Sequence, residues 1–206
     1  LHGMALVGGD TTRGPLSIAV TAMGLVESGK ALRRDGARVG DDIWVTGTLG
    51  DAASALRSVL SGAATDAGSR ARLDRPVPRV DAGMRLSGLA NACIDLSDGL
   101  LADLAHVCER SGVGAEVRLE SLPASVALRS VESSSRWPLQ ACGGDDYELC
   151  FTAARRNRES IVQALDFASV VATRVGRIVA GQGVLALDDS GNEWHPARPG
   201  YEHFSD

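Results

Sequence analysis

The sequence has few cysteines, and their spacing excludes the usual cysteine-based sites. Only 4 of the 206 residues are cysteines, and no pair shows the Cys-x-x-Cys spacing of a zinc or redox motif. Each stands among apolar or strand-forming residues, at Cys93, Cys108, Cys142 and Cys150. We therefore expect reduced thiols in the core of a cytoplasmic protein, and no zinc site.

The sequence also lacks an excess of positive charge and any long hydrophobic run. Its formal net charge is -5, whereas a surface that binds nucleic acid needs a basic face. No apolar run approaches the length that crosses a bilayer. We therefore expect neither nucleic acid nor a membrane as a partner. Hydrophobic residues make up 44% of the chain, which is typical of a soluble globular protein.

Two kinds of catalytic motif are absent. No Gly-x-x-x-x-Gly-Lys-Ser/Thr phosphate-binding loop occurs in the sequence. The local sequence indicates no Ser-His-Asp or Cys-His arrangement either, which argues against covalent acyl chemistry. We accordingly predict no covalent nucleophile and no general base.

The most informative stretch runs from Ile94 to Leu104. Asp95 and Asp98 stand close together with Ser97 between them, and apolar residues with helical spacing follow at Leu100, Leu104, Val107 and Cys108. A helix N-terminus attracts anions because its first N–H groups are unpaired. Aspartates suit the hard cation that a phosphate would bring along. The pattern indicates a metal and phosphate site; the alternative is that Ser97 or Asp98 only caps the helix.

Similar acidic turns stand elsewhere in the chain. A glycine pair followed by an aspartate occurs twice, in Gly8-Gly9-Asp10 and in Gly143-Gly144-Asp145. Paired glycines let a backbone approach a ligand closely, and the aspartate would present a carboxylate there. The alternative is an ordinary turn at the end of a strand.

Hydrophobic periodicity predicts several strands and helices. We expect strands near residues 5–7, 16–26, 43–46, 115–119, 147–151, 170–178 and 183–188. We expect helices over residues 51–60, 79–89, 100–110 and 157–166. In the first of these helices, Asp51 is the expected N-cap and the apolar stripe is Ala52, Leu56, Val59 and Leu60. Residues 61–72 and 133–135 are expected to be loops, and residues 27–41 are the candidate domain boundary.

Six motifs together resemble the thiamine-monophosphate kinase family, within the superfamily of aminoimidazole-ribonucleotide and selenophosphate synthetases. The resemblance covers essentially the whole chain. The motifs are Val7-Gly8-Gly9-Asp10-Thr11-Thr12, Arg34-x-Gly36-Ala37-x-x-Gly40-Asp41, Val45-Thr46-Gly47-Thr48-x-Gly50-Asp51, Ile94-Asp95-x-Ser97-Asp98-Gly99-Leu100, Gly143-Gly144-x-Asp146-Tyr147-Glu148-Leu149 and Gly200-Tyr201-x-His203-Phe204.

The resemblance implies a mixed α/β fold in two parts. Residues 1–30 would be the last strands of an N-terminal α+β domain that binds ATP and forms the dimer. Residues 31–206 would be the C-terminal α/β domain. Because the chain begins at Leu1 in Gly-rich sequence, we expect that N-terminal material is missing and that this piece alone is inactive.

The resemblance also implies which residues form the site. For ATP it implies contacts from Gly9, Asp10, Arg34 and Ser97. For several Mg²⁺ ions it implies ligands at Asp10, Asp95 and Asp98. For the thiamine phosphate it implies contacts from Asp145 and Tyr201. The family often has glutamate at the position of Asp145, where the shorter side chain would reach through water.

The expected reaction is direct in-line transfer of a phosphoryl group from ATP to thiamine monophosphate. Such a transfer needs positioning and cancellation of charge more than covalent chemistry from the protein. Two alternatives stay open at this point. One is a different ATP-dependent enzyme of the superfamily, which makes aminoimidazole ribonucleotide or selenophosphate. The other is a non-catalytic fragment that binds nucleotide.

Overall fold

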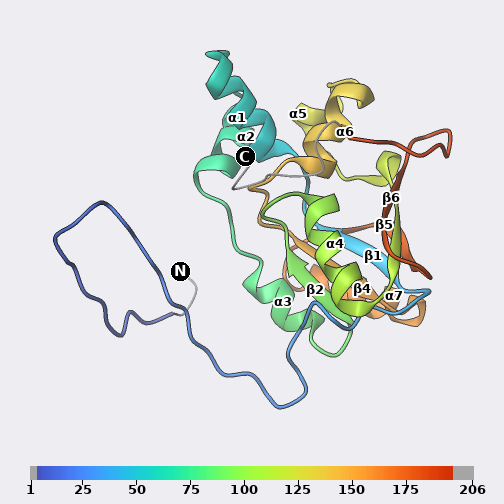
Figure 1. Cartoon of the computed structure of the whole chain (residues 1–206), viewed down its shortest axis with the longest axis horizontal. Helices are drawn as coiled ribbons and strands as arrows, with labels where there is room; N and C mark the ends of the chain where they lie inside the picture. Colours follow the sequence, from blue (N-terminus) through green and yellow to red (C-terminus); the bar gives the residue numbers. More distant parts are fainter. Residues whose placement is uncertain (1–3, 197–206) are drawn as a thin grey trace. The chain divides into compact units, whose positions relative to one another are not determined.

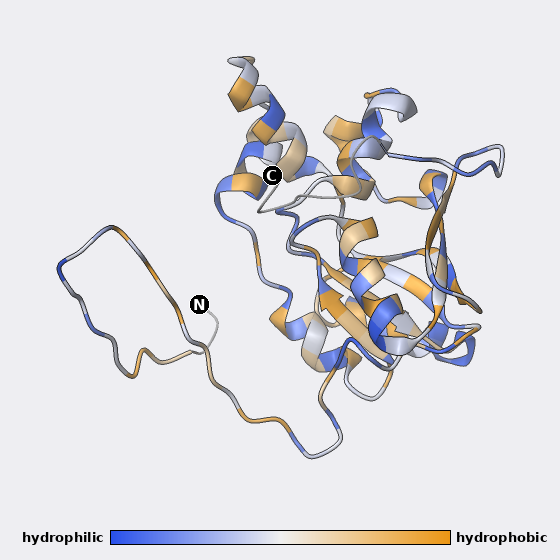
Figure 2. Cartoon of the chain, in the orientation of Figure 1, coloured by the Kyte–Doolittle hydropathy of each residue, from blue (hydrophilic) through white to orange (hydrophobic). Residues whose placement is uncertain are grey.

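The computed structural model describes residues 4–196, and the chain divides into two units, Leu1–Ala31 and Leu32–Asp206. Residues 4–31 form no helix or strand, so the strands predicted near 5–7 and 16–26 are wrong. Large apolar side chains there are exposed, including Ile18 at 82% and Val20 at 88%, and Figure 2 shows this segment alternating between hydrophobic and hydrophilic colours. An isolated strand is not stable because its backbone groups need a hydrogen-bonding partner, and the six-stranded sheet includes no residue of this segment.

The second unit is built on one six-stranded sheet (Figure 1) with the strand order β2-β4-β1-β5-β3-β6. All neighbouring strands are antiparallel except β3 and β6, which are parallel. The strands are β1 (Asp42–Thr46), β2 (Ala92–Asp95), β3 (Gly114–Arg118), β4 (Leu149–Ala153), β5 (Ala172–Val179) and β6 (Gly183–Leu187).

Seven α-helices and two short 3₁₀ helices surround this sheet within the described chain. The α-helices are α1 (Asp51–Ser61), α2 (Ala67–Asp74), α3 (Val80–Leu86), α4 (Leu100–Ser111), α5 (Val126–Arg129), α6 (Ser133–Cys142) and α7 (Arg158–Asp166). The 3₁₀ helices are η1 (Leu119–Ser121) and η2 (Arg155–Asn157).

Helices cover both faces of the sheet, but to different extents. On one face, α4 and α6 pack against residues from all six strands and bury the largest core, which includes Leu104 and Val117. On the other face, α3 and α7 pack on β1 and β4, where the rings of Trp44 and Phe151 are stacked with centroids 6.1 Å apart. This mixed α/β arrangement agrees with the predicted fold class.

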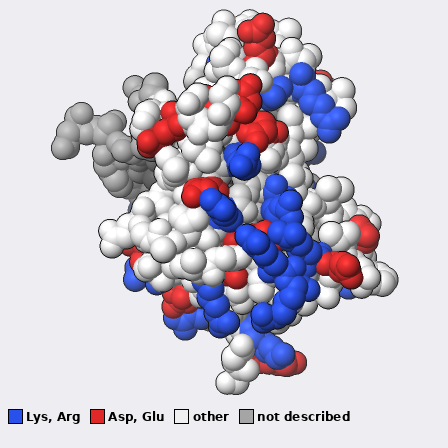
Figure 3. Space-filling view, turned by 90° about the vertical axis from the view of Figure 1, so that its right-hand side faces the viewer, with Lys and Arg blue, Asp and Glu red and all other residues white. Residues whose placement is uncertain are grey.

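The part of the sheet formed by β5, β3 and β6 carries exposed basic side chains. Arg118, Arg174 and Arg177 are exposed, and Figure 3 shows that Lys and Arg side chains gather on the side of the molecule where β5 and β6 lie. Two of these arginines pair with neighbouring acids: Arg177 lies 2.7 Å from Glu116, and Arg118 lies 3.3 Å from Glu120. The expectation of no nucleic-acid partner stays a prediction.

Several sequence predictions are confirmed, and others are wrong in detail. The helices from residues 100 and 157 and the strands near 43, 115, 170 and 183 are present. The loops predicted at 61–72 and 133–135 instead overlap α2 and the start of α6. Helix α2 has no apolar stripe to reveal it, and its first turn is held by Asp66, whose carboxylate accepts from the Ser69 N–H at 2.8 Å.

Helix α1 also differs from its prediction. Its N-cap is Gly50 rather than Asp51, and Asp51 accepts a hydrogen bond from the Thr48 hydroxyl at 2.7 Å. The buried face consists of Asp51, Ala52 and Ala55, whereas Leu60 is 79% exposed. The helix therefore packs through small residues, which a count of large apolar residues does not detect.

All four cysteines are free, with Cys108 and Cys150 buried and Cys93 and Cys142 partly buried. Burial raises the pKa of Cys93 to about 12 and of Cys108 to about 11. Between residues 4 and 196, no helix is both long enough and apolar enough to span a bilayer.

Candidate functional site

The turn that carries Asp95 and Asp98 is fixed by a single buried carboxylate. The N–H groups of Ser97, Asp98 and Gly99 all donate to one oxygen of Asp103, at 3.0, 3.1 and 3.1 Å. Asp103 lies in the first turn of α4 and is only 2% exposed. Burial raises the pKa of Asp103, although these three N–H donors act in the opposite direction. The backbone between β2 and α4 is therefore held in one conformation.

The alternative that Ser97 or Asp98 caps the helix is wrong. The N-cap of α4 is Gly99, and no side chain makes a capping hydrogen bond there. Gly99 has a φ of +117°, and a Cβ atom would lie 2.8 Å from the backbone of Cys142. Asp103 stabilises the helix start from inside, where a negative charge also suits the helix dipole. The side chains of Asp95 and Asp98 thus have no capping role.

The segment Gly143–Glu148 lies directly against this turn. The Asp145 N–H donates to the Ser97 carbonyl at 2.9 Å, and the Tyr147 N–H donates to the Leu96 carbonyl at 2.8 Å. A Cβ on Gly144 would lie 2.5 Å from the Ser97 carbonyl oxygen, so only glycine permits this approach. Two acidic turns that are far apart in the sequence are thereby brought together.

The strand expected near residues 147–151 does not include Tyr147, so Tyr147 shares no strand face with Leu149 and Phe151. Strand β4 begins at Leu149, whereas Asp145 and Tyr147 have left-handed φ values of +66° and +49°. The Tyr147 hydroxyl donates to the Asp145 carboxylate at 3.3 Å. The pKa of Tyr147 is raised, first by burial and then by the negative charges of Asp145, Asp95 and Asp98. The Asp145 carboxylate therefore lies beside the Tyr147 hydroxyl, and the charges of Asp95 and Asp98 act on the same phenol.

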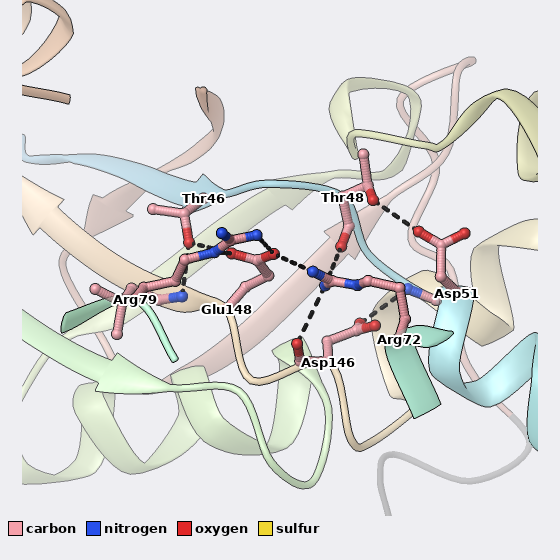
Figure 4. A network of polar contacts seen from close by, with 9 residues as sticks. Thr46, Thr48, Asp51, Arg72, Arg79, Asp146 and Glu148 are labelled. Atoms are coloured by element: carbon pink, nitrogen blue, oxygen red, sulfur yellow. Dashed lines mark hydrogen bonds and ion pairs between the residues drawn. The ribbon is translucent and has the colours of Figure 1, made fainter. Parts of the chain in front are cut away.

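Beneath these outward residues lies a buried network of charges centred on Glu148, shown in Figure 4. Glu148 is fully buried. It forms a bidentate pair with Arg79 at 2.6 and 2.7 Å, an ion pair with Arg72 at 2.9 Å, and accepts from the Thr46 hydroxyl at 2.6 Å. Burial alone would raise the pKa of Glu148, but these partners outweigh it and lower the pKa. The network ties β4 to α2, α3 and the end of β1.

Asp146 is anchored beside this network. One oxygen accepts from the Gly50 N–H at 2.8 Å, while the other has no hydrogen-bond partner among the described residues. Burial raises the pKa of Asp146 to about 8. Asp146 and Glu148 point inward and fix the segment, so Asp145 and Tyr147 point outward. Local sequence had identified the acids as a cluster, but not which of them are structural.

A pocket of about 980 Å³ lies next to Tyr147. Arg34 and Asp95, which the sequence assigned to ATP and to metal, both line it. Its apolar lining includes Leu32, Val80, Ile94 and Leu149, and its other arginines are Arg33, Arg79 and Arg110. Arg33 pairs with Asp35 and Arg79 pairs with Glu148. Arg34 is held beside α4 because its carbonyl accepts from the Ser111 hydroxyl at 3.3 Å.

Not all of the predicted site residues are brought together by this geometry. Asp145 is hydrogen-bonded to Tyr147, Asp95 lines the same pocket as Tyr147, and Ser97 and Asp98 lie in the turn that contacts Asp145. Gly9 and Asp10 belong to the other unit of the chain, and Tyr201 lies outside the described residues. No group of three His, Cys, Asp or Glu side chains in the described part of the chain is placed to hold a metal ion. The predicted magnesium ligands therefore do not form a complete site in this unit.

Comparison with known proteins identifies the family of the chain. A family model for AIR synthase related protein, C-terminal domain, matches residues 38–188. The chain belongs to this family. The matched residues of this AIR synthase-related domain include Asp95, Asp98, Asp103 and Tyr147, so the turn and the buried network both lie within it.

Curated relatives match nearly all of the chain. The thiamine-monophosphate kinase of Escherichia coli (strain K12) is 43% identical over 213 residues, covering 99% of this chain and 65% of the relative. The thiamine-monophosphate kinase of Aquifex aeolicus (strain VF5) is 33% identical, covering 97% of this chain and 63% of the relative. The chain thus spans slightly less than two thirds of the length of these relatives. The resemblance predicted from the six motifs is confirmed.

Solved structures share the fold. Thiamine-monophosphate kinase from Stenotrophomonas maltophilia K279a has a TM-score of 0.74 at 50% identity, covering 78% of this chain and 54% of that one. AaThiL complexed with AMPPCP and TMP has a TM-score of 0.69 at 32% identity, covering 84% of this chain and 54% of that one. Escherichia coli HypE has a TM-score of 0.67 at 19% identity, which shows the fold alone.

Proposed function

We propose that the protein containing this chain transfers a phosphoryl group from ATP to thiamine monophosphate and forms thiamine diphosphate. The similarity to thiamine-monophosphate kinases over nearly the whole chain supports this assignment. The structural neighbour complexed with AMPPCP, an ATP analogue, and TMP supports the same pair of substrates. The observation that carries the proposal is the pocket that joins Arg34 to Asp95 and Tyr147.

Arg34 is the proposed contact of the ATP phosphates. Its side chain is exposed and lines the pocket, and a guanidinium can bind phosphate through two parallel hydrogen bonds. Ser97, Gly9 and Asp10 are further proposed contacts of the nucleotide. Asp145 and Tyr201 are the proposed contacts of the thiamine phosphate.

Asp10, Asp95 and Asp98 are the proposed ligands of magnesium. Asp95 is exposed and Asp98 half-buried, so both can offer carboxylate oxygens, the ligand type that magnesium prefers. Magnesium commonly binds through one or two carboxylates plus substrate phosphates and water. The residues present therefore fit a shared site better than an all-protein cage. When bound, magnesium would offset the negative charge that collects on the transferring phosphates.

The proposed reaction is in-line transfer without a phospho-enzyme. The acceptor is already a phosphate, largely ionised near neutral pH, so no general base is required. The chain's own contribution is then to position two anions and to limit their repulsion. We also propose a homodimer, a cytoplasmic location, and no nucleic-acid or membrane partner.

A coupled assay of product formation tests this function. The protein should form thiamine diphosphate from thiamine monophosphate, ATP and Mg²⁺, and should show no turnover with formylglycinamidine ribonucleotide or selenide as the acceptor. Turnover with either of those acceptors would favour another enzyme of the superfamily. Nucleotide binding without turnover of any acceptor would favour the non-catalytic alternative.

A further inference from the structure

Tyr147 is the aromatic residue that lines the pocket, and its backbone conformation is unusual. A φ of +49° is rarely adopted by a bulky residue with a Cβ atom. Left-handed conformations of this kind cost free energy and persist where the surrounding structure imposes them, often at ligand sites. Here the conformation follows from Asp146 and Glu148, which are anchored inside on either side of Tyr147. The strain therefore serves to turn one phenol outward.

The surroundings of that phenol differ from one side to the other. Leu149 and Ile94 line the same pocket as the ring and contribute to its apolar lining. The Asp145 carboxylate accepts a hydrogen bond from the Tyr147 hydroxyl, and Asp95 lines the same pocket. Tyr147 is 39% exposed, so a ligand can reach the ring. The ring thus lines a pocket whose walls contain both apolar and acidic residues.

The arginines that line the pocket differ in whether they are already paired with an acid. Arg79 is engaged by Glu148, and Arg33 by Asp35. Arg34 and Arg110 make no ion pair among the described residues, and Arg34 is tethered near the C-terminal end of α4. Asp98, in contrast, precedes the N-terminal end of α4. One part of the pocket therefore presents arginines that can bind an anion. Another part presents an aromatic ring and acidic residues that can bind a cation.

A ligand that is cationic at one end and anionic at the other fits this distribution. Thiamine monophosphate has this character, because its thiazolium ring carries a fixed positive charge and a short linker joins it to the phosphate. Aromatic faces attract such cations through the ring quadrupole. We propose, resting on the proposed function, that the ring of Tyr147 binds the thiazolium ring of thiamine monophosphate, with the Asp145 carboxylate beside it.

A neutral analogue of the substrate tests the charge directly. In this analogue, a thiophene ring replaces the thiazolium ring of thiamine monophosphate, so that shape is kept and charge is lost. Calorimetric titration of the full protein measures the affinity for each ligand, without any need for turnover. The wild type should bind the cationic ligand about tenfold more tightly than the neutral one. Equal affinities would overturn the proposal without any substitution.

Substitutions then test whether Tyr147 causes the preference for the cationic ligand. Tyr147→Phe should retain most of the preference because the ring face remains, whereas Tyr147→Leu should reduce it about five- to tenfold. Phe167→Leu is the matched control: Phe167 is 77% exposed, and its ring contacts Arg85 rather than the pocket. An unchanged preference in Tyr147→Leu, with native circular dichroism, would overturn the proposal. The kinase assay of the wild type decides the proposed function separately, because it does not depend on which residue binds the ring.

Discussion

Asp146 is a buried carboxyl group of which only one oxygen accepts a hydrogen bond from the described residues. Its raised pKa, about 8, has burial as the main cause. In the unfolded chain the pKa of an aspartate is about 3.9. Between these values the native protein keeps a proton that the unfolded chain releases. The free energy of unfolding should therefore fall as pH rises through this interval, by up to about 1.4 kcal/mol per pH unit.

Asp146→Asn should remove that dependence. The amide oxygen can still accept from the Gly50 N–H, while no charge can form. We expect the stability of the variant relative to the wild type to increase between pH 5 and pH 8, as measured by urea denaturation at each pH. Parallel curves for the two proteins over this range would show that Asp146 is already ionised in the native state.

Asp95 and Asp98 lie at the surface of the same region but should affect activity, not stability. Asp95→Asn and Asp98→Asn each remove a charged oxygen ligand, so we expect kcat to fall by about 100-fold or more. The free energy of unfolding should change by less than about 0.5 kcal/mol, as for other surface substitutions. Asp74→Asn is the control, since Asp74 is 47% exposed in an ion pair with Arg70 on α2. Near wild-type turnover in both variants would contradict the metal assignment.

At the scale of the element, the start of α4 depends on Asp103. Asp103→Ala would leave the N–H groups of residues 97, 98 and 99 without their shared acceptor. Unpaired buried donors cost about 1–3 kcal/mol, so we expect a loss of stability in that range and a higher Mg²⁺ concentration for half-maximal turnover. Asp103→Asn retains one acceptor oxygen and should restore most of both. An unchanged Mg²⁺ dependence in Asp103→Ala would limit Asp103 to a structural role.

Elements with strong periodicity could be predicted from the sequence, and others could not. Helices α4 and α7 carry apolar stripes that include the buried Leu104 and Leu165, and these were predicted correctly. Helix α2 was missed because it has no apolar stripe, and because its Arg72 pairs with Glu148, which is distant in sequence. The predicted start of strand β4, at residue 147, was too early because alternation does not reveal the left-handed turn at Tyr147. Local patterns report local packing and omit contacts made across the fold.

The candidate site could also be predicted only in part from the sequence. The glycine and aspartate motifs indicated the two turns, because each has its own short signature. Their contact through Ser97 and Asp145 required the fold, and so did the distinction between outward Asp145 and inward Asp146. The positions of Gly9, Asp10 and Tyr201 relative to these turns stay predictions.

At the scale of the whole molecule, folding and activity should depend on different parts of the chain. All three hydrophobic clusters consist of residues numbered 32 or higher, whereas residues 4–31 contribute no buried side chain. Removing residues 1–31 should therefore shift Tm by less than about 2 °C, because buried apolar area dominates stability.

The same truncation should abolish magnesium-dependent turnover, because it removes Asp10 from the proposed set of metal ligands. Asp10→Asn in the otherwise intact protein is the matched variant, and it should lose turnover to a similar degree with no change in Tm. Calorimetry of unfolding and the coupled assay would be run on the intact protein, the truncated protein and Asp10→Asn. Full activity in the truncated protein would show that the reaction needs no ligand from residues 1–31. A large fall in Tm would show instead that the first unit packs on the second and contributes to its stability.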